Sequence, residues 1–581
     1  MAQTDRDLAS IAEARSLARR AKAAAPILAE FSQEQIDAIV DAMAAAVTPQ
    51  AEALARLAHE ETGYGVVADK IQKNLFASEN VYRFIRPMRT VGVIRRLEDR
   101  KVIEIAEPFG VVCAIVPTTN PTSTAIYKIL IAIKARCPVV ISPHPSAVRC
   151  ISRVAEIMSE AARRAGAPDG SISCMTTVTL EGTQELMKAR EVAVILATGG
   201  MGLVRAAYSA GKPAYGVGPG NAPAFIERTA DIAKAVRDVV IGKTFDNGVL
   251  CSSENSVVVD GPVVEEVRRE FVKNGGYFMS AAEIDAVAAV LLSPQRLPNP
   301  ALVGRPATVI AQAAGITVPA GTRVLIAELK GVGRDYPLSI EKLSPVLSFY
   351  VVADWKEGCE RCIEILRYGG MGHTMSIHSR NDQIILEFGL KKPAGRIVVN
   401  TPTTHGSIGL TTGMDPAMTL GCGGWGGNIT SDNISPRHLL NIKRLAYEVT
   451  PAVYARPLAA PAGDALATAS AIGGSGLPKS PGPPRAPGGI AADVLARRID
   501  EFLTSRGYRP APAPSAAAPP PPLAPSAVTV EKPADFVCED DVRQALKQNR
   551  KIVIGERSIL TPAARDLGEE HRVFVQASWP R

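Results

Sequence analysis

The pattern of hydrophobic and polar positions changes several times along the chain. Residues 6–48 carry apolar residues, mostly alanine, at helical spacing, and Ser32 with Gln35 has the sequence of a capping box for a second helix. The stretch TVGVIRRLEDRKVIEIAEP alternates in short runs around LEDR, which predicts a β-hairpin over about 90–108 that Pro108 closes. The chain is therefore expected to begin with helices that lead into a hairpin.

Strands and helices alternate from Gly110 onward. The apolar runs predict strands at 110–117, 138–142 and 192–198, with helices over 122–136, 146–165 and about 182–189. This βαβα order predicts a parallel, doubly wound sheet whose ligand lies at the carboxyl ends of the strands. After a helix at 228–242, residues 256–450 repeat strand–helix units and predict a second α/β domain.

The composition breaks at about Thr450. Residues 451–488 and 508–528 are rich in Pro, Ala and Gly and are typical of disordered or partly extended linkers. Between them, residues 489–507 form an amphipathic helical pattern that has no domain of its own to bury its apolar face. This pattern predicts a docking peptide for a partner's groove, or else a helix that folds back on its own enzyme. Residues 529–581 predict a small module with a helix over 540–549 and a short strand.

Composition and charge exclude several classes of protein. A net charge of +7 is small for 581 residues, and without a dense Lys/Arg block it argues against nucleic-acid binding. The polar N-terminus and the absence of a long apolar run predict neither a signal peptide nor a membrane span. Nine cysteines at irregular spacing indicate a reducing compartment, the cytoplasm. Cys359 and Cys362 have CxxC spacing but fall in one expected helix without a second pair, so we expect no metal site.

One stretch, FDNGVLCSSENSVV (245–258), carries the strongest candidate for catalysis. It places Cys251 between a small-residue loop, which Gly248 allows to turn tightly, and an apolar run that predicts a strand. Ser252 and Ser253 leave the sulfur approachable, and nearby backbone N–H groups can lower the pKa of a thiol. A structural cysteine buried in the core is the alternative, and this stretch alone does not decide between the two.

Two loops follow predicted strands at the expected ligand edge. PTTNPTS (117–123) and ATGGMG (197–202) supply small residues and helix-starting N–H groups, which suit a dinucleotide or a phosphate. Neither is GxGxxG, so plain turns remain the alternative. GVGPGNAPAF (216–225) predicts a further glycine-rich loop ahead of the Cys251 stretch.

These motifs together resemble the aldehyde dehydrogenase superfamily, specifically its CoA-acylating branch. VPTTNPTSTAIYK, ATGGMGLV, GVGPGNAPAF, FDNGVLCSSENS, EKLSPVLSFY, GGMGHTMSIHS and CGGWGGNITSDNISPRHLLNIK carry the resemblance, which covers about residues 8–450. Within that branch, the motifs resemble those of the acetaldehyde and propionaldehyde dehydrogenases of bacterial microcompartments. The implied α/β architecture has a Rossmann-type cofactor domain (1–240, with the hairpin at about 90–108 for oligomerisation), a catalytic domain (241–430), an oligomerisation segment (431–450) and a disordered C-terminal extension.

The resemblance assigns roles to individual residues. Cys251 matches the nucleophile, and Asn120 matches the asparagine whose amide forms an oxyanion hole with the backbone N–H of the cysteine. Glu341 matches the glutamate that holds the nicotinamide ribose. The remaining residues expected at the cofactor are Thr118, Thr119, Thr198, Gly199, Gly200 and Gly218.

The implied reaction is the oxidation of a short aldehyde, propionaldehyde or acetaldehyde, with NAD and CoA as cofactors. A thioester on Cys251 would be transferred to CoA to give acyl-CoA. Hydrolysing relatives carry a glutamate base in the loop that aligns with GVGPGNAP, where this chain has Gly216, Val217 and Gly218. A hydrolysing aldehyde dehydrogenase and a catalytically silent scaffold are the alternatives.

The resemblance also bears on partners and on three histidines. The segment 489–507 resembles an encapsulation peptide, which implies a shell protein as partner and a place in the microcompartment lumen, and the core implies a homo-oligomer, a dimer or tetramer. The 529–581 module resembles one found on other microcompartment enzymes, with no role assigned. We expect His373 in its glycine-rich turn to be structural, His144 to border the adenine site or a surface loop, and His405 to lie in a loop near the active-site mouth.

Overall fold

The computed structural model describes residues 3–452, 534–548, 550–561, 564–565, 567–568 and 571–576. It forms two compact units, Met1–Pro457 and Leu458–Arg581, and each is described here by itself. Apart from residues 451–452, the predicted linkers and the predicted helix 489–507 lie outside the described residues.

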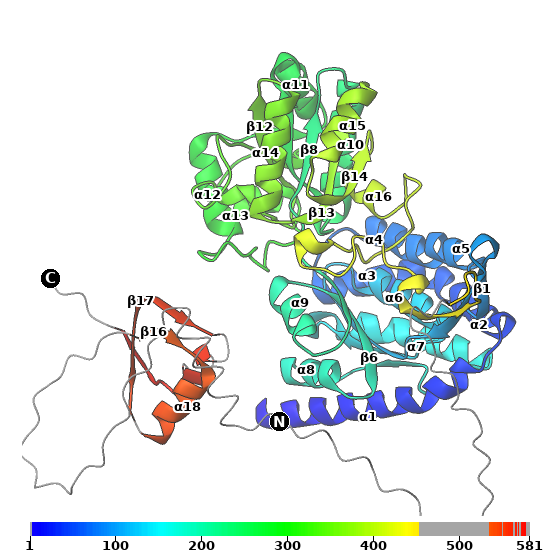
Figure 1. Cartoon of the computed structure of the whole chain (residues 1–581). Helices are drawn as coiled ribbons and strands as arrows, with labels where there is room; N and C mark the ends of the chain where they lie inside the picture. Colours follow the sequence, from blue (N-terminus) through cyan, green and yellow to red (C-terminus); the bar gives the residue numbers. More distant parts are fainter. Residues whose placement is uncertain are drawn as a thin grey trace, which may run out of the picture. The chain divides into compact units, whose positions relative to one another are not determined.

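The first unit opens with helices, as the alanine-rich pattern predicts (Figure 1). The predicted capping box is confirmed: Gln35 N donates to Ser32 Oγ at 3.3 Å, and Ser32 N donates to Gln35 Oε1 at 2.8 Å. Alanines such as Ala14 and Ala18 are fully buried against the first sheet, because their small side chains let the helix approach it closely. The helices are α1 (Gln3–Ala29), α2 (Gln33–Val47), α3 (Ala51–Thr62), α4 (Val67–Leu75) and α5 (Val81–Ile85).

A five-stranded parallel sheet forms the centre of the N-terminal half, in the order β5-β4-β3-β6-β7. Val112 and Ala114 of β3 face one hydrophobic core, and Cys113 faces the core on the opposite side. The order reverses between β3 and β6, which creates a topological switch point at their carboxyl ends. The elements are β3 (Val111–Val116), α6 (Pro121–Lys134), β4 (Val139–Pro143), α7 (Val148–Arg164), β5 (Ile172–Cys174), α8 (Leu180–Lys188), β6 (Val192–Thr198), α9 (Met201–Tyr208) and β7 (Ala214–Val217).

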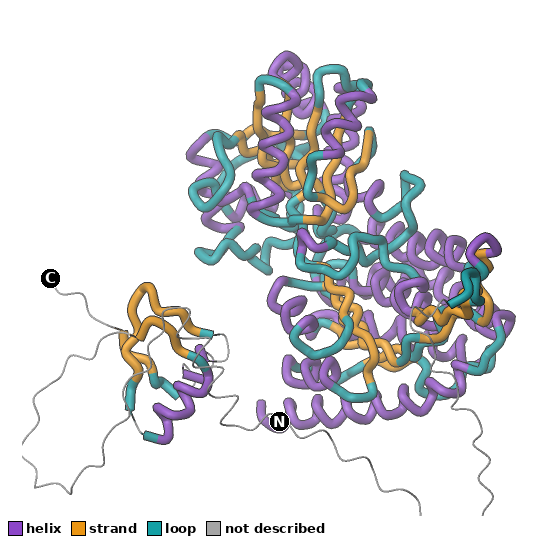
Figure 2. Tube along the Cα trace, in the orientation of Figure 1, coloured by secondary structure: helices purple, strands orange, loops and turns teal. Residues whose placement is uncertain are grey.

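A seven-stranded parallel sheet forms the second half, in the order β10-β11-β12-β9-β8-β13-β14. Helices cover both of its faces (Figure 2), with Val257 and Val259 in one core and Val258 in the other. The elements are β8 (Ala222–Ile226), α10 (Ile232–Thr244), β9 (Glu254–Asp260), α11 (Val264–Lys273), β10 (Gly276–Phe278), α12 (Ala281–Leu291), α13 (Ala307–Ala313), β11 (Val324–Glu328), β12 (Val346–Val352), α14 (Trp355–Tyr368), β13 (Gly372–His378), α15 (Asp382–Leu390), β14 (Ala394–Val399) and α16 (Thr403–Ser407).

Two sequence expectations differ from this arrangement. The segment 216–225 is not one loop, because its ends are strands β7 and β8 and only residues 218–221 connect them. β8 pairs with β9 and β13, so the change from the first sheet to the second precedes the boundary expected at residue 240. Glycine and proline disfavour strands, so the sequence of this segment does not predict the fully buried strand Ala222–Ile226. Pairing with a strand on each side stabilises it.

The predicted hairpin is confirmed and gains a third strand. β1 (Gly92–Leu97) pairs antiparallel with β2 (Val102–Pro108), and β15 (Leu440–Ala446) pairs antiparallel with the other side of β2. The expected segment 431–450 therefore supplies a strand to the hairpin sheet.

The second unit contains a three-stranded parallel sheet, β16-β17-β18. Its predicted helix and strand are present, and Val542 and Ala545 of the helix are buried in a small core with Val537 and Ile552. The elements are β16 (Ala534–Val537), α18 (Glu539–Lys547), β17 (Ile552–Leu560) and β18 (Phe574–Gln576).

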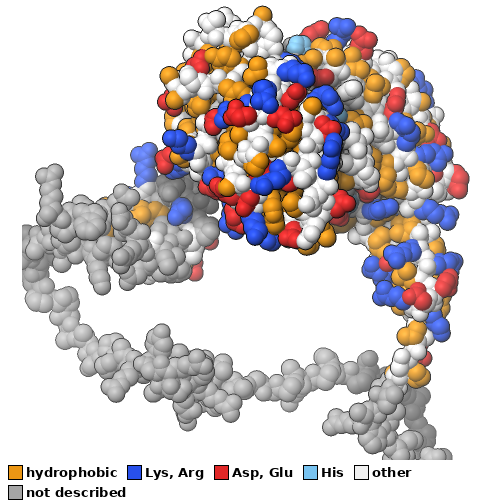
Figure 3. All heavy atoms as spheres, turned by 90° about the horizontal axis from the view of Figure 1, so that it is seen from above, with side chains coloured by type: hydrophobic (Ala, Val, Ile, Leu, Met, Phe, Trp, Pro, Cys, Tyr) orange, Lys and Arg blue, Asp and Glu red, His pale blue; other side chains and the backbone are white. Residues whose placement is uncertain are grey.

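Side chains of both charges are interspersed over the face of the molecule seen in Figure 3. Within the described residues, no helix has the length and apolar character that crossing a membrane requires. The same part of the chain contains no cluster of three or more His, Cys, Asp or Glu side chains arranged to hold a metal ion. Cys359 and Cys362 are both buried on α14, as the sequence predicts for helix residues.

Candidate active site

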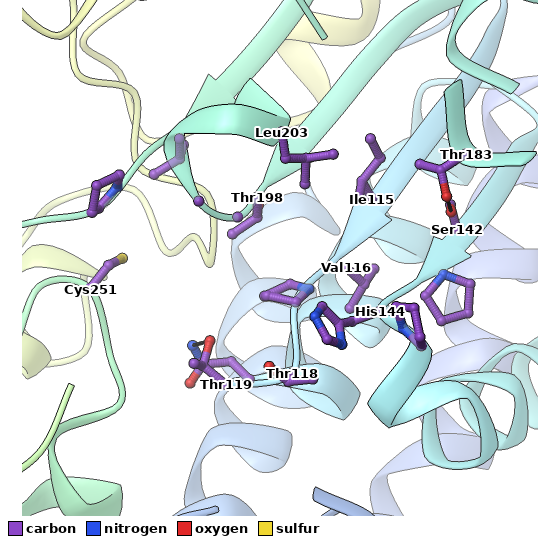
Figure 4. A pocket seen from close by; sticks show the side chains of 18 of the residues that line it. Ile115, Val116, Thr118, Thr119, Ser142, His144, Thr183, Thr198, Leu203 and Cys251 are labelled. Carbon is purple, nitrogen blue, oxygen red and sulfur yellow. Dashed lines mark hydrogen bonds between the residues drawn. The ribbon is translucent and has the colours of Figure 1, made fainter. Parts of the chain in front are cut away.

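A cavity of about 500 Å³ lies at the switch point of the first sheet. It brings together all the site residues predicted from the sequence, from segments far apart in the chain (Figure 4). Cys251 lies toward one end of the cavity and Ser142 and Thr183 toward the other, with Thr198 and Thr118 between them. The predicted residues that line it are Thr118, Thr119, Asn120, Thr198, Gly199, Gly200, Gly218, Cys251 and Glu341.

The loop that carries Cys251 has an unusual backbone. Asp246 and Asn247 adopt φ of 50° and 54°, in the left-handed region that non-glycine residues rarely enter, and Gly248 follows with φ of 73°. Asn247 Nδ2 donates to the backbone oxygen of Gly304 at 2.9 Å, which holds this turn from a neighbouring loop. The turn leaves Cys251 half-buried at the cavity, immediately before β9.

The thiol does not have the lowered pKa that the sequence analysis expects. Burial and the nearby Glu341 carboxylate raise the pKa of Cys251 to about 12, although the Arg396 guanidinium and the backbone N–H of Cys251 act in the opposite direction. Local N–H groups favour a thiolate, but the apolar surroundings of Cys251, which the local sequence does not show, disfavour it more strongly. The free enzyme therefore holds Cys251 as a thiol at neutral pH.

Asn120 lies at the N-terminus of α6, directly after the loop that follows β3. It is 9% exposed, and its Oδ1 accepts a hydrogen bond from Lys73 Nζ at 2.7 Å. Its Nδ2 is 3.2 Å from Thr119 Oγ1. With Oδ1 occupied, the amide N–H₂ is the side of Asn120 that can donate to an oxygen in the cavity.

The other end of the cavity has features that suit a dinucleotide. Thr198 Oγ1 is buried and has no hydrogen-bond partner among the described residues, so a ligand hydroxyl or phosphate can occupy it. Gly200 precedes α9, and a Cβ there would meet nothing within 4 Å. The end of β6 thus presents the unpartnered Thr198 hydroxyl and open space at the N-terminus of α9 to the cavity, which suits an anion at a helix N-terminus.

Glu341 and Gly220 connect the two halves of the site. Gly220 N donates to Glu341 Oε1 at 2.9 Å, and burial raises the pKa of Glu341 to about 8. A Cβ on Gly220 would lie 1.9 Å from the backbone oxygen of Cys251, so only glycine fits there. The sequence does not single out Gly220 from the other glycines of the segment 216–225.

The three histidines differ in position. His373 lies in strand β13 rather than in a turn; it is fully buried, and a Cβ on Gly220 would be 3.4 Å from its ring. Burial and the Arg396 guanidinium lower the pKa of His373 to about 3, and its Nε2 has no partner among the described residues. His144 lines the cavity. His405 lies in α16 and packs on Phe245, with ring centroids 4.7 Å apart, at a separate pocket.

A sequence profile of the aldehyde dehydrogenase family matches residues 4–276. The bifunctional aldehyde-alcohol dehydrogenase AdhE of Escherichia coli K12 is 44% identical over 442 residues, which are 75% of this chain and 50% of that protein. The chain therefore spans about half the length of that curated relative.

Two solved structures match this chain over nearly their whole length. An acetylating aldehyde dehydrogenase from Geobacillus thermoglucosidasius is 51% identical, with a TM-score of 0.76 over 77% of this chain and 99% of that chain. A propionaldehyde dehydrogenase from the Clostridium phytofermentans fucose utilisation bacterial microcompartment is 28% identical, with a TM-score of 0.67 over 74% and 96% of the two chains. The fold and these matches lead to one conclusion: the chain belongs to the aldehyde dehydrogenase family.

Proposed function

We propose that this protein is a CoA-acylating aldehyde dehydrogenase that oxidises a short aldehyde, propionaldehyde or acetaldehyde, with NAD and CoA. The observation that carries the proposal is the cavity itself. It combines a cysteine, an amide donor and a dinucleotide-like end, while the segment 216–219 beside it offers no carboxylate. Among the described residues that line the cavity, Glu341 is the acidic one, and Gly220 N–H already holds it.

The chain's own residues account for the acylation step. Cys251 Sγ attacks the aldehyde carbon, and the thiol proton, still present at neutral pH, passes to water in the cavity as the C–S bond forms. Asn120 Nδ2 and the backbone N–H of Cys251 donate to the developing oxyanion. Loss of hydride from that carbon leaves a thioester on Cys251.

The residues present fit the nicotinamide dinucleotide that this reaction needs. When bound, such a cofactor supplies the hydride acceptor. Gly199, Gly200 and the free Thr198 hydroxyl would hold its pyrophosphate, and Glu341 would hold the nicotinamide ribose. Thr118, Thr119 and Gly218 would line its path along the cavity.

The acceptor of the thioester separates the proposed reaction from hydrolysis. A water molecule needs a general base, whereas the thiol of CoA ionises more readily by itself. Val217 and Gly218 cannot act as a base, and in the proposed complex Glu341 binds Gly220 N–H and the nicotinamide ribose rather than a water molecule. Transfer to CoA is therefore favoured over release of a free acid.

The first test mixes purified protein with propanal and NAD, with and without CoA, and follows NADH. We expect continuous turnover only with CoA. Equal turnover without CoA would show that water resolves the thioester, which is the hydrolysing alternative. Substitution of NADP for NAD in the same assay determines the cofactor preference.

We propose further that residues 489–507 direct the enzyme to a microcompartment shell protein, so that it acts as a homo-oligomer in the lumen. Support comes from the amphipathic sequence pattern and from the likeness to a microcompartment enzyme. The compact unit Met1–Pro457 contains the whole cavity, so truncation after residue 455 should preserve turnover and abolish co-sedimentation with shells. Loss of turnover would contradict this division of roles, and co-sedimentation of a full-length protein that shows no turnover would support the scaffold alternative.

A further inference from the structure

Three charged side chains are buried together beneath the candidate active site. Lys70 and Lys73 of α4 are each 2% exposed, and both ammonium groups contact the fully buried carboxylate of Asp246. Lys70 Nζ lies 3.0 Å from Asp246 Oδ2, and Lys73 forms a closer ion pair with the same oxygen. Asp69 is a second carboxylate near the two lysines, so charge balance accounts for burying both cations but not for the contact that Lys73 makes beyond Asp246.

Lys73 differs from Lys70 in one contact. Its Nζ also donates to Asn120 Oδ1 at 2.7 Å, whereas Lys70 makes no hydrogen bond to Asn120 in the described part of the chain. An ammonium group can only donate, so it requires the amide oxygen of Asn120 to face α4. The amide N–H₂ is thereby directed to the other side.

We propose that Lys73 is the positioning residue of the oxyanion hole: it fixes the orientation of the Asn120 amide and ties it, through Asp246, to the loop that carries Cys251. The proposal rests on the proposed function of Asn120 and Cys251. Lys73 spans two sheets, since Asn120 follows β3 of the first sheet and Asp246 precedes β9 of the second. Its positive charge also polarises the amide, which strengthens Nδ2 as a donor to an oxyanion.

The charge state of Lys73 depends on pH. The charged groups that face it are Asp246, Lys70 and Asp69. Burial lowers the pKa of Lys73 to about 8, although Asp246 partly offsets the effect. Above about pH 8 the amine loses its proton, so the constraint on the Asn120 amide should weaken and acylation should slow relative to a variant that lacks an amine at position 73.

The test compares Lys73→Met with Lys70→Met. Both variants remove a buried ammonium from Asp246 and leave it one cationic partner, but only the first frees Asn120. The readouts are the single-turnover formation of NADH from propanal and the release of 4-nitrophenolate from 4-nitrophenyl acetate. The ester acylates Cys251 through its own oxyanion and needs neither NAD nor CoA, so it reports on the oxyanion hole even if propanal is not a substrate.

We expect Lys73→Met to slow both acylations roughly 10- to 100-fold, and Lys70→Met to change them less than about threefold by the same reasoning. Ionisation of Cys251 raises the rate of every variant as the pH rises, so the effect of Lys73 is read as a ratio: the wild-type rate divided by the Lys73→Met rate should decline above about pH 8. Lys73→Gln, which keeps a neutral donor, should recover part of the rate without the decline, and it replaces Lys73→Met in the comparison if Lys73→Met does not fold.

Equal ester rates in the two methionine variants would overturn the proposal. A wild-type protein that reacts with the ester but forms no NADH with either cofactor would instead refute the proposed function.

Discussion

The substitution Gly220→Ala tests the closest approach in the candidate active site. The added Cβ would lie 1.9 Å from the backbone oxygen of Cys251, and reaching ordinary contact at 3.4 Å requires a displacement of about 1.5 Å. The carbonyl cannot rotate away freely, because it belongs to the short turn between Gly248 and β9. The Cys251 loop must therefore move, and the hydrogen bond of Gly220 N to Glu341 must change with it.

A misplacement of about 1 Å at a reacting group costs on the order of 100-fold in rate. We expect Gly220→Ala to lower kcat/KM for CoA-dependent aldehyde oxidation at least about 100-fold by this reasoning. The alkylation rate of Cys251 by iodoacetamide should change as well, since the sulfur itself is displaced.

Gly202→Ala is the matched control. Its Cβ would meet nothing within 4 Å, and Gly202 does not itself line the cavity, although its neighbours Gly200 and Leu203 do. It should retain wild-type kcat/KM. If Gly220→Ala stays within threefold of wild type while folded, the packing between this loop and Cys251 does not control catalysis.

Three further predictions concern single side chains. Asn120→Ala removes one oxyanion donor and should lower kcat about 100- to 1000-fold with little change in KM; a loss below tenfold would remove Asn120 from the oxyanion hole. Val217→Glu supplies a carboxylate where the chain has none, so NADH formation without CoA should rise relative to Val217→Gln, and no rise would mean that a missing base does not prevent hydrolysis. Lys128→Met leaves the backbone oxygens of Ile115 and Leu196 without the donor that lies 2.7 and 2.9 Å away, and should cost about 2 kcal/mol or more in urea unfolding. Burial lowers the pKa of Lys128 to about 7, so the unfolded chain binds a proton that the folded chain lacks between about pH 7 and 10.5. Wild-type stability should therefore fall as the pH is lowered through this range, and a wild-type slope no steeper than that of Lys128→Met would contradict the assignment.

Much of the fold follows from local sequence signals. The strands Val111–Val116 and Val192–Thr198 are continuous apolar runs, which is the pattern of strands buried on both faces of a parallel sheet. The loops after such strands meet at one edge, so the sequence could also predict that Asn120 and Thr198 share a cavity.

The rest depends on contacts between distant segments. Strand Ala222–Ile226 lies in a glycine- and proline-containing stretch, and only its pairing with β9 and β13 makes it a strand. Lys70 and Lys73 have the spacing of an ordinary polar helix face, so nothing local shows that they are buried against Asp246. The high pKa of Cys251 likewise comes from the apolar surroundings that the whole fold creates.

The ion-pair network of α4 has a consequence for recombination. Lys73 comes from the N-terminal helices, Asn120 from the first sheet and Asp246 from the loop before the second sheet. A chimera that takes its cofactor half from one relative and its catalytic half from another would cut through this network between residues 120 and 246. Exchange of halves is compatible with an ordered site only when the parent of the first half carries Lys73 and Asn120 and the parent of the second half carries Asp246. This shared requirement constrains which enzymes of the family can be joined at the sheet boundary.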